Sequence, residues 1–269
     1  MNDMIAQALK GVADPTVKRL VLAEWMQHLI LQSVYRNDLF GKLVFTGGTA
    51  LRLLYQTGRF SEDLDFSLLR KKGFKFTAAL EKIQRDLKSQ HCGFEFYAKE
   101  EKKVARADFR FPNLLQQYGL SPLKNQKLTI KFEIDTHPPA GGKTEMALVA
   151  QPISYTVCVF DLPSLFATKL HALFYRGYTK GRDYYDLVWY LGRRVKPNFN
   201  LLNRAIRQTE GAGHEIHEED FNRSLSAHLK KIDFNKAQAE VSRFLIHTEE
   251  VQLLDRALIQ NLLERHYAV

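Results

Sequence analysis

Two short segments of the chain combine residue types that could bind a nucleotide and a divalent metal ion. Gly47, Gly48 and Thr49 follow the apolar run LVFT and precede a helix-like segment. Glycines let backbone amides approach an anion closely, and a helix start adds partial positive charge, so this turn could hold phosphate groups. Thr49 could add a hydroxyl contact to a phosphate oxygen. The P-loop pattern GxxxxGK[ST] is absent, and an ordinary glycine turn is the alternative explanation.

Asp63 and Asp65 lie two residues apart in SEDLDFSL, where apolar and polar residues alternate. This spacing predicts a strand with both carboxylates on one side, where their oxygens could bind one Mg²⁺ ion. Glu133 and Asp135 alternate with apolar residues in KLTIKFEID, a second predicted strand. If the two strands are neighbours, Glu133 or Asp135 adds a further carboxylate for metal-assisted phosphoryl chemistry. A solvated acidic strand is the simpler explanation of the Asp63–Asp65 pair alone.

Five charged residues in the second half of the chain lie at helical spacing. Lys169 projects from an otherwise apolar helix face, where its ammonium could contact phosphate oxygens or its stem could simply be buried. Asp183 and Asp186 are three residues apart, so both could face one site, or both could stabilise a helix start. Arg176 and Arg182 could bind phosphates or form surface ion pairs.

The elements that must position these residues follow from the apolar periodicity. It predicts helices over 16–35, 49–56 and 76–90 and strands over 43–46, 61–68, 93–98, 104–111, 127–135 and 155–160. Gly58 can end the second of these helices. After Pro152 the pattern becomes mostly helical, with helices over 163–176, 183–193, 199–209, 219–231, 234–247 and 250–266. The chain therefore reads as an α+β protein with a sheet-forming first part and a helical second part.

The composition is that of a folded domain with a basic surface. The 269 residues are 45% hydrophobic and 26% charged, and no apolar run approaches 18 residues. The start of the chain lacks a signal pattern, so we expect a cytoplasmic protein with no membrane segment. Cys92 and Cys158 are isolated and are expected to be reduced and partly buried. The formal charge of +9 favours nucleic acid or phosphorylated substrates as partners.

Taken together, the motifs resemble one known family. The segments FTGGTALRLLY, GRFSEDLDF, KFEI, LFATKLHALFYR and GRDYYDL look like the AbiEii/AbiGii toxin family of nucleotidyltransferases, which includes the MenT-type toxins. The resemblance is dense over residues 44–68 and 161–191. It implies the nucleotidyltransferase fold of the DNA polymerase β superfamily, with a mixed β-sheet flanked by helices and a mostly helical C-terminal region. The corresponding domains would be a core over 1–160 and a helical domain over 161–269 that completes the active site.

The resemblance also assigns functional residues. The family's phosphate-binding turn and metal-binding pair correspond to Gly47, Gly48, Thr49, Asp63 and Asp65. Its later lysine and RD motif, both needed for activity, correspond to Lys169, Arg182, Asp183 and Asp186. Of these, we prefer Asp183 for the chemistry and Asp186 for structural support, and Glu133 fits the third carboxylate best, with Asp135 as the alternative.

The predicted function is transfer of a nucleoside monophosphate from an NTP to an acceptor hydroxyl, with Mg²⁺ or Mn²⁺ as cofactor. The resemblance implies the 3′ end of tRNA as acceptor, a role as the toxin of a toxin–antitoxin or phage-defence system, and a cognate antitoxin as partner. One alternative keeps the chemistry and changes the acceptor to a small molecule or a protein side chain. Another is a catalytically silent module that binds RNA.

Overall fold

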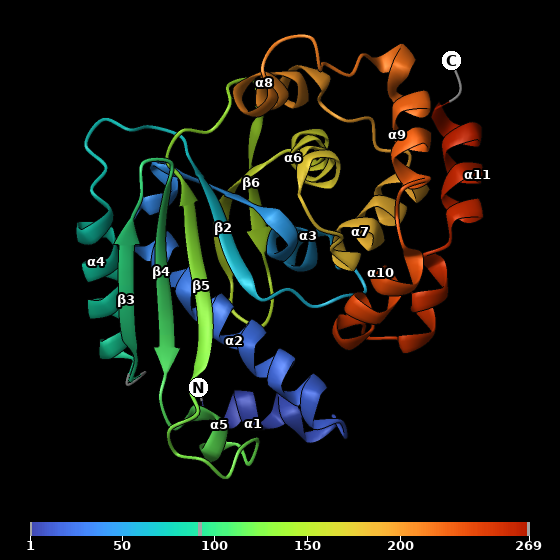
Figure 1. The fold of residues 1–269 in the computed structure, drawn as a ribbon. Coiled ribbons are helices and arrows are strands. Elements are labelled where there is room, and N and C mark those ends of the chain that lie inside the picture. Colours follow the sequence, from blue (N-terminus) through green and yellow to red (C-terminus); the bar gives the residue numbers. More distant parts are fainter. Residues whose placement is uncertain (1, 91–92, 268–269) are drawn as a thin grey trace. The chain divides into compact units, whose positions relative to one another are not determined.

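The computed structural model describes residues 2–90 and 93–267 (Figure 1). Its internal contacts divide the chain into two compact units, which we call the sheet unit and the helical unit. The sheet unit contains the residues up to Gln56 together with Phe60–Pro138 and Glu145–Val159. The helical unit contains Thr57–Arg59, Pro139–Thr144 and the residues from Phe160 onward. Two short segments that precede residue 160 in the sequence therefore belong to the helical unit.

Within the described residues, seven strands form one sheet in the order β3-β4-β5-β2-β1-β7-β6. The strands are β1 (Leu43–Thr46), β2 (Asp63–Leu68), β3 (Glu95–Glu100), β4 (Val104–Phe111), β5 (Leu128–Asp135), β6 (Thr144–Val149) and β7 (Tyr155–Phe160). Parallel pairs join β2 to β5 and β1 to β7, whereas β1–β2, β3–β4 and β4–β5 are antiparallel. The sheet is therefore mixed, and helices flank it (Figure 1), which confirms the predicted fold class.

Alternation along the central strands separates a buried face from a polar one. Leu64 and Phe66 of β2 are buried, as are Phe132 and Ile134 of the neighbouring β5. The Phe66 and Phe132 rings lie 4.6 Å apart between centroids, so the two strands contribute to one aromatic core. The residues between them, beginning with Asp63, are left on the opposite face at intermediate exposure.

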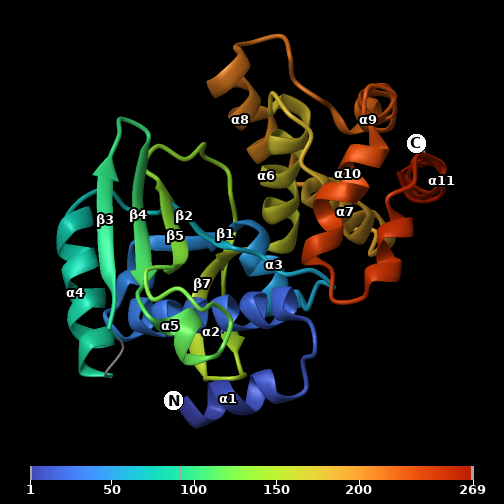
Figure 2. The ribbon, with the colours of Figure 1, turned by 60° about the horizontal axis from the view of Figure 1, so that its bottom comes forward.

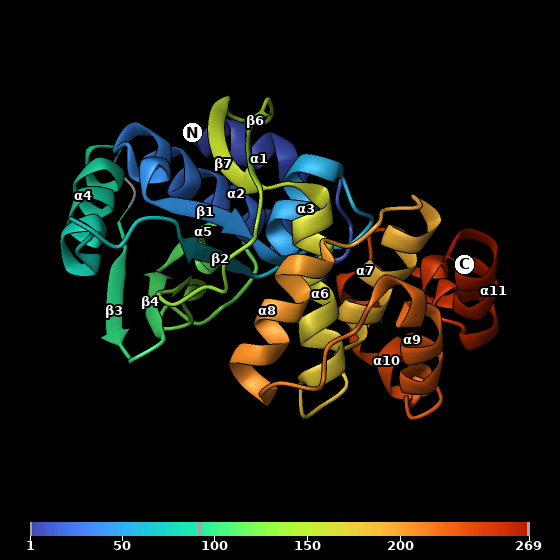
Figure 3. The same ribbon diagram turned by 90° about the horizontal axis from the view of Figure 1, so that it is seen from above.

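The helices of the sheet unit are α1 (Asn2–Lys10), α2 (Pro15–Arg36), α3 (Gly47–Tyr55), α4 (Phe76–Ser89) and α5 (Leu114–Gln117). The long helix α2 begins where the Asp14 carboxylate accepts the Thr16 amide at 2.6 Å, with a proline in its first turn. It contacts α4 and β5, and Figure 3 shows both helices on the same side of the sheet. In Figure 2, α1 lies against α2, in agreement with their contacts.

The helical unit packs its helices around α7. Its helices are α6 (Leu162–Tyr175), α7 (Gly181–Gly192), α8 (Phe199–Glu210), α9 (Phe221–Leu229), α10 (Phe234–Val241) and α11 (Arg256–Tyr267). α7 contacts α6, α10 and α11, and Figure 3 shows α6 beside both α7 and α8. The start of α7 approaches α10 closely, because a Cβ on Gly181 would lie 1.9 Å from the Ala237 carbonyl oxygen. A glycine is therefore required where the two helices meet.

Several predicted helix boundaries were wrong. The helix expected over 234–247 ends at Val241, and the one expected over 250–266 begins at Arg256, where the Asp255 carboxylate accepts the Leu258 amide at 2.8 Å. Short 3₁₀ turns fill the interval between them. α3, expected over 49–56, spans Gly47–Tyr55, and Gln56, rather than Gly58, ends it in a left-handed conformation with φ of 54°.

The sequence patterns also missed three elements, the short helices α1 and α5 and the edge strand β6. β6 gives no alternating signal because Met146 and Leu148 are exposed rather than buried in a core. Cys158 is buried, and Cys92 lies outside the described residues. None of the helices that the structure describes combines the length and apolar character that crossing a bilayer requires.

Candidate active site

The glycine turn joins β1 to α3 in a conformation that only glycine adopts without strain. Gly47 has φ of +77°, and a Cβ at this position would lie 2.2 Å from an Asp65 carboxylate oxygen. The carboxylate of β2 therefore lies directly against the backbone of the turn. Thr46, which precedes the helix, makes no capping hydrogen bond with its side chain. The first amides of α3 are thus at a helix start of the kind that binds anions.

Thr49 occupies a different place from the one expected of a phosphate ligand. It is fully buried, and its hydroxyl donates to the backbone carbonyl of Asp63. This hydrogen bond ties the first turn of α3 to the start of β2. Thr49 therefore holds the glycine turn and the acidic strand together, with its hydroxyl already engaged.

The sheet register brings carboxylates from two strands together. Asp65 is paired with Thr46 of β1 on one side and with Glu133 of β5 on the other. β2 and β5 are thus neighbours, which is the arrangement the sequence prediction required. Glu133 also forms an ion pair of 2.8 Å with Arg106 of β4. Asp63 is paired with Lys131 and is half-buried.

Asp135 lies one side-chain pair further along β5, opposite Ser67. Its carboxylate accepts the His137 amide at 2.9 Å, and burial raises its pKa above the ordinary value. Glu133 is therefore the carboxylate adjacent to Asp65, whereas Asp135 is held by the turn that follows its strand.

The carboxylates on the polar face of β2 fit a hard divalent cation. Asp63 and Asp65 are on the same face of β2 and offer carboxylate oxygens, the ligands that Mg²⁺ prefers. Among the described residues, no group of three or more His, Cys, Asp or Glu side chains is assembled closely enough to hold a metal ion. Because Glu133 is turned to Arg106, the fit rests on the Asp63–Asp65 pair.

The helical unit contains a second group of charged residues, which we call the ion cluster. Lys169 of α6 contacts two carboxylates of α7, Asp183 at 2.9 Å and Asp186 at 2.8 Å. Arg176 reaches the other Asp183 oxygen at 2.5 Å. Arg59 donates to both Asp186 oxygens, at 2.6 and 2.5 Å, in a two-point contact. The helical spacing of Asp183 and Asp186 thus does bring both carboxylates to one lysine.

The ion cluster is charged although it is buried. Burial acts to lower the pKa of Lys169, but attraction from Asp183 and Asp186 outweighs it, so that this pKa is raised. Burial acts to raise the pKa of Asp183, but Lys169 and Arg176 bring it below the ordinary value. The pKa of Asp186 is likewise lowered, because Arg59 and Lys169 outweigh its burial. All these groups therefore carry their charges at neutral pH.

The two arginines predicted to bind phosphate differ in exposure. Arg182 is buried, pairs with Glu240 at 3.2 Å and stacks on Phe244, with 3.9 Å from its guanidinium carbon to the ring centroid. Arg176 keeps 27% of its side chain exposed while it binds Asp183. Of the two, Arg176 presents the more accessible guanidinium.

Arg59 is the charged residue of the cluster that the sequence patterns missed. It is 2% exposed, and its partner lies 127 positions away in the chain. The sequence shows only an arginine directly before the segment FSEDLDF, and this position does not indicate a role unless its partner is known.

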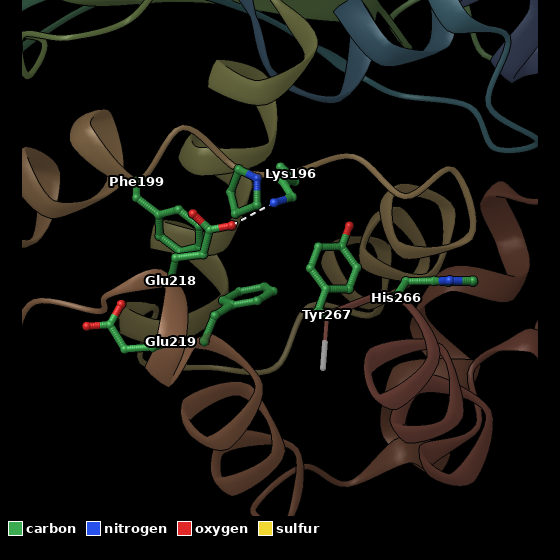
Figure 4. Close-up of a pocket in the computed structure, with 8 residues that line it drawn as sticks. Lys196, Phe199, Glu218, Glu219, His266 and Tyr267 are labelled. Atoms are coloured by element: carbon green, nitrogen blue, oxygen red, sulfur yellow. Dashed lines mark hydrogen bonds and ion pairs between the residues drawn. The ribbon is translucent and has the colours of Figure 1, made fainter. Parts of the chain in front are cut away.

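The cavity shown in Figure 4 contains none of the predicted residues. It has a volume of about 350 Å³, and its lining includes Lys196, Phe199 and Tyr267.

A mixed sheet with a glycine turn against a strand that carries two aspartates defines a nucleotidyltransferase fold. Two crystal structures share it. JHP933 from Helicobacter pylori is 22% identical, with a TM-score of 0.51 over 90% of this chain and 94% of that one. A second H. pylori protein, described as a candidate nucleotidyltransferase, is 19% identical, with a TM-score of 0.53 over 94% and 98% of the two chains.

The family follows from the sequence model of the AbiEii nucleotidyl transferase toxins of type IV toxin–antitoxin systems, which matches residues 29–264. The chain belongs to this family and is a nucleotidyltransferase. Membership implies an NTP substrate and an antitoxin partner. A search of curated proteins found no match.

Proposed function

We propose that this toxin transfers a nucleoside monophosphate from an NTP to the 3′-terminal hydroxyl of tRNA, with Mg²⁺ or Mn²⁺ as cofactor. The observation that carries the proposal is the contact between the Gly47 backbone and the Asp65 carboxylate, with Glu133 on the adjacent strand. This contact supports the proposal, because an anion-binding turn and metal-binding oxygens would then lie side by side. Nucleotidyl transfer needs both, because the substrate is a metal-bound triphosphate.

In the proposed reaction the sheet unit binds the triphosphate and positions the acceptor. Amides at Gly47 and Gly48 hold phosphate oxygens, and Thr49 keeps that turn fixed to β2 through its hydrogen bond to Asp63. Asp63 and Asp65 would hold the metal ion. When bound, such an ion neutralises phosphate charge and acts as a Lewis acid.

Glu133 is our assignment for the general base. The acceptor oxygen forms a bond to the α-phosphorus while the bond from that phosphorus to the bridging oxygen breaks, and pyrophosphate leaves. The proton of the acceptor hydroxyl passes to the Glu133 carboxylate. Arg106, 2.8 Å from that carboxylate, holds the Glu133 side chain in place on the polar face of the sheet.

We assign the ion cluster to the same activity. Lys169 acts as a positive point charge on phosphate oxygens, and Asp183 holds the ammonium through its 2.9 Å contact. Arg176 is a further phosphate-binding candidate because 27% of its side chain is exposed. Arg182, engaged by Glu240, and Asp186, fully buried, have supporting roles.

The acceptor is proposed from charge and from the family. A formal charge of +9 favours a polyanionic partner over a neutral metabolite or an ordinary protein side chain. Since tRNA and NTPs are cytoplasmic, we place the activity in the cytoplasm. The cognate antitoxin remains the expected protein partner.

The test is to incubate the purified protein with each of four α-labelled NTPs and total tRNA, with Mg²⁺, with Mn²⁺ or with a chelator. We expect label at the tRNA 3′ end with one or two NTPs, loss of labelling in chelator, and loss with Asp65→Asn. Label on protein or on a small molecule would overturn the tRNA assignment. Tight tRNA binding with no label under any condition would instead indicate a silent RNA-binding module.

A further inference from the structure

Arg59 belongs to a segment, Thr57–Arg59, that lies between the glycine turn and β2 in the sequence but forms part of the helical unit. Arg59 forms an isolated antiparallel bridge with Leu245. The Ile246 amide donates to the Gly58 carbonyl at 2.9 Å. This hydrogen bond is part of the bridge, which therefore fixes the backbone from which the Arg59 side chain starts.

The packing at Gly58 adds a second restraint. A Cβ at this position would lie 2.5 Å from the Tyr185 hydroxyl oxygen and 2.5 Å from a Glu250 carboxylate oxygen. Tyr185 in turn donates a hydrogen bond to Glu250. The segment is thus packed tightly against α7, the helix that carries Asp186.

The fixed Arg59 side chain pairs with Asp186, and each is almost fully shielded from water. Their side chains are 2% and 0% exposed, and two hydrogen bonds join them. A buried carboxylate without such a partner would be strongly unfavourable. Arg59 therefore cancels the charge of Asp186 at a place that no external ion reaches.

The charges of the ion cluster do not balance. It contains three cations, Arg59, Lys169 and Arg176, and two anions, Asp183 and Asp186. Of the three cations, Lys169 and Arg176 have exposed side-chain surface, 13% and 27%, whereas Arg59 is 2% exposed. Without Arg59 the four remaining charges of the cluster would sum to zero, because the two aspartates would compensate Lys169 and Arg176. Lys180, which also interacts with Asp183, is present with or without Arg59 and does not change this difference of one charge.

We propose that Arg59 is a positioning residue for the transferase reaction: by neutralising Asp186, it leaves Lys169 and Arg176 with an uncompensated positive charge for the phosphates of the NTP. This inference rests on the proposed function, which assigns Lys169 to the nucleotide. Arg59 itself does not touch the substrate. Its effect reaches the nucleotide through Asp186 and Lys169.

The test compares Arg59→Met with the double variant Arg59→Met/Asp186→Asn. The single change removes the surplus charge, whereas the double change restores it, because one cation and one anion are both lost. We expect Arg59→Met to raise the KM for NTP about tenfold or more, the scale of a lost charge-assisted contact. The double variant should return KM to within about threefold of the unmodified protein and recover much of the lost Tm.

A purely structural role for Arg59 predicts a different result. The folded fraction of Arg59→Met would then keep the original KM, and only kcat per total protein would fall. That result would overturn the proposal, as would a folded double variant whose KM stays about tenfold raised. If Arg59→Met does not fold, the double variant alone tests the proposal. A KM within about threefold of the unmodified protein supports it, and a KM raised about tenfold overturns it.

Lys169→Ala separates failure of this inference from failure of the proposed function. If Lys169→Ala leaves KM and kcat unchanged, the assignment of the ion cluster to the reaction is wrong. If Lys169→Ala raises KM but Arg59→Met does not, the assignment of Lys169 stands and only the role of Arg59 fails.

Discussion

Asp63 and Asp65 in the sheet unit and Asp183 and Asp186 in the helical unit are both pairs of closely spaced carboxylates, but their surroundings differ. The first pair lies half-buried on the polar face of a strand. The second pair is 3% and 0% exposed, and its oxygens contact cations of the same unit. Carboxylates that stay accessible can bind an external cation, whereas those that are buried and paired determine the position and charge of their partners. Under the proposed function the same residue type therefore serves two purposes, and burial distinguishes them.

Of the effects expected to distinguish the two aspartate pairs, the largest is the loss of transferase activity when Asp65 is replaced. Asp65→Asn should lower nucleotidyl transfer on the order of a thousandfold or more, because a metal-binding carboxylate is lost. Its Tm should change little, since the side chain is half-buried on the polar face. Asp135→Asn is the matched control, an acidic residue that faces Ser67 instead of Asp65. Labelling rates and Tm are measured on both variants. If Asp135→Asn lost as much activity as Asp65→Asn, the special role of Asp65 would be refuted.

The next largest effect concerns stability at Asp186. Asp186→Ala leaves the Arg59 guanidinium buried without its carboxylate, so the free energy of unfolding should fall by about 3 to 5 kcal/mol. The matched control is Glu218→Ala, which breaks the exposed ion pair with Lys196 and should cost less than about 1 kcal/mol. Urea unfolding measures both. Equal losses would show that burial does not distinguish these pairs.

Acid should affect the two units over different pH ranges. Burial, and then the charge of Arg52, lowers the pKa of His28 in the sheet unit from 6.5 to about 4. The unfolded chain thus binds this proton at a higher pH than the folded one. Stability that is complete above pH 6.5 therefore decreases as the pH falls toward 4, by up to about 3 kcal/mol.

The aspartates of the ion cluster respond at lower pH. Their pKa values lie below 3.8 in the folded protein, so their contribution is complete above that pH and is lost as the pH falls through the folded values. Tm measured from pH 7 to pH 2 should therefore fall in two ranges. His28→Gln should flatten only the upper range, and His247→Gln, at an exposed histidine, should change neither. A single decline below pH 4 in the unmodified protein would contradict this assignment.

The smallest effect is expected at the glycine turn. Gly47→Ala places a Cβ against Asp65 at a positive φ, so it should cost about 1 to 2 kcal/mol of stability. It should also reduce transfer at least tenfold, because Asp65 must move away from the turn. Gly41→Ala is the control, since nothing lies within 4 Å of its added Cβ. Calorimetry and labelling of the two variants check the prediction, and full activity in Gly47→Ala would contradict it.

Much of the sheet could be predicted because its strands carry their own pattern. The alternation in β2 and β5 indicated strand type, buried face and polar face, and these agree with the structure. The edge strand β6 could not be predicted in this way, because exposed Met146 and Leu148 produce no alternation. Boundaries such as the start of α11 depended on a single cap at Asp255, which competes weakly with a continuing helical pattern.

The candidate site was predictable in part for the same reason. Gly47, Asp63 and Asp65 lie within 19 residues of sequence, so local spacing sufficed to connect them. Arg59 could not be assigned, because its carboxylate partner is 127 positions away and only burial shows that the pair must exist. The engagement of the Thr49 hydroxyl by the Asp63 carbonyl was likewise invisible, since backbone acceptors leave no mark in a sequence.

The sequence by itself determined the residue types that we propose for the reaction: a glycine turn, two aspartates on a strand, and a lysine with an aspartate on later helices. These follow from local periodicity and spacing. Only the tertiary structure decided which of these groups keep their charge available. That outcome depends on burial and on partners brought together from distant parts of the chain. It leaves Asp63 and Asp65 half-buried on the polar face of β2, turns Thr49 into an internal support, and brings the buried Arg59 to the carboxylate that Lys169 also contacts.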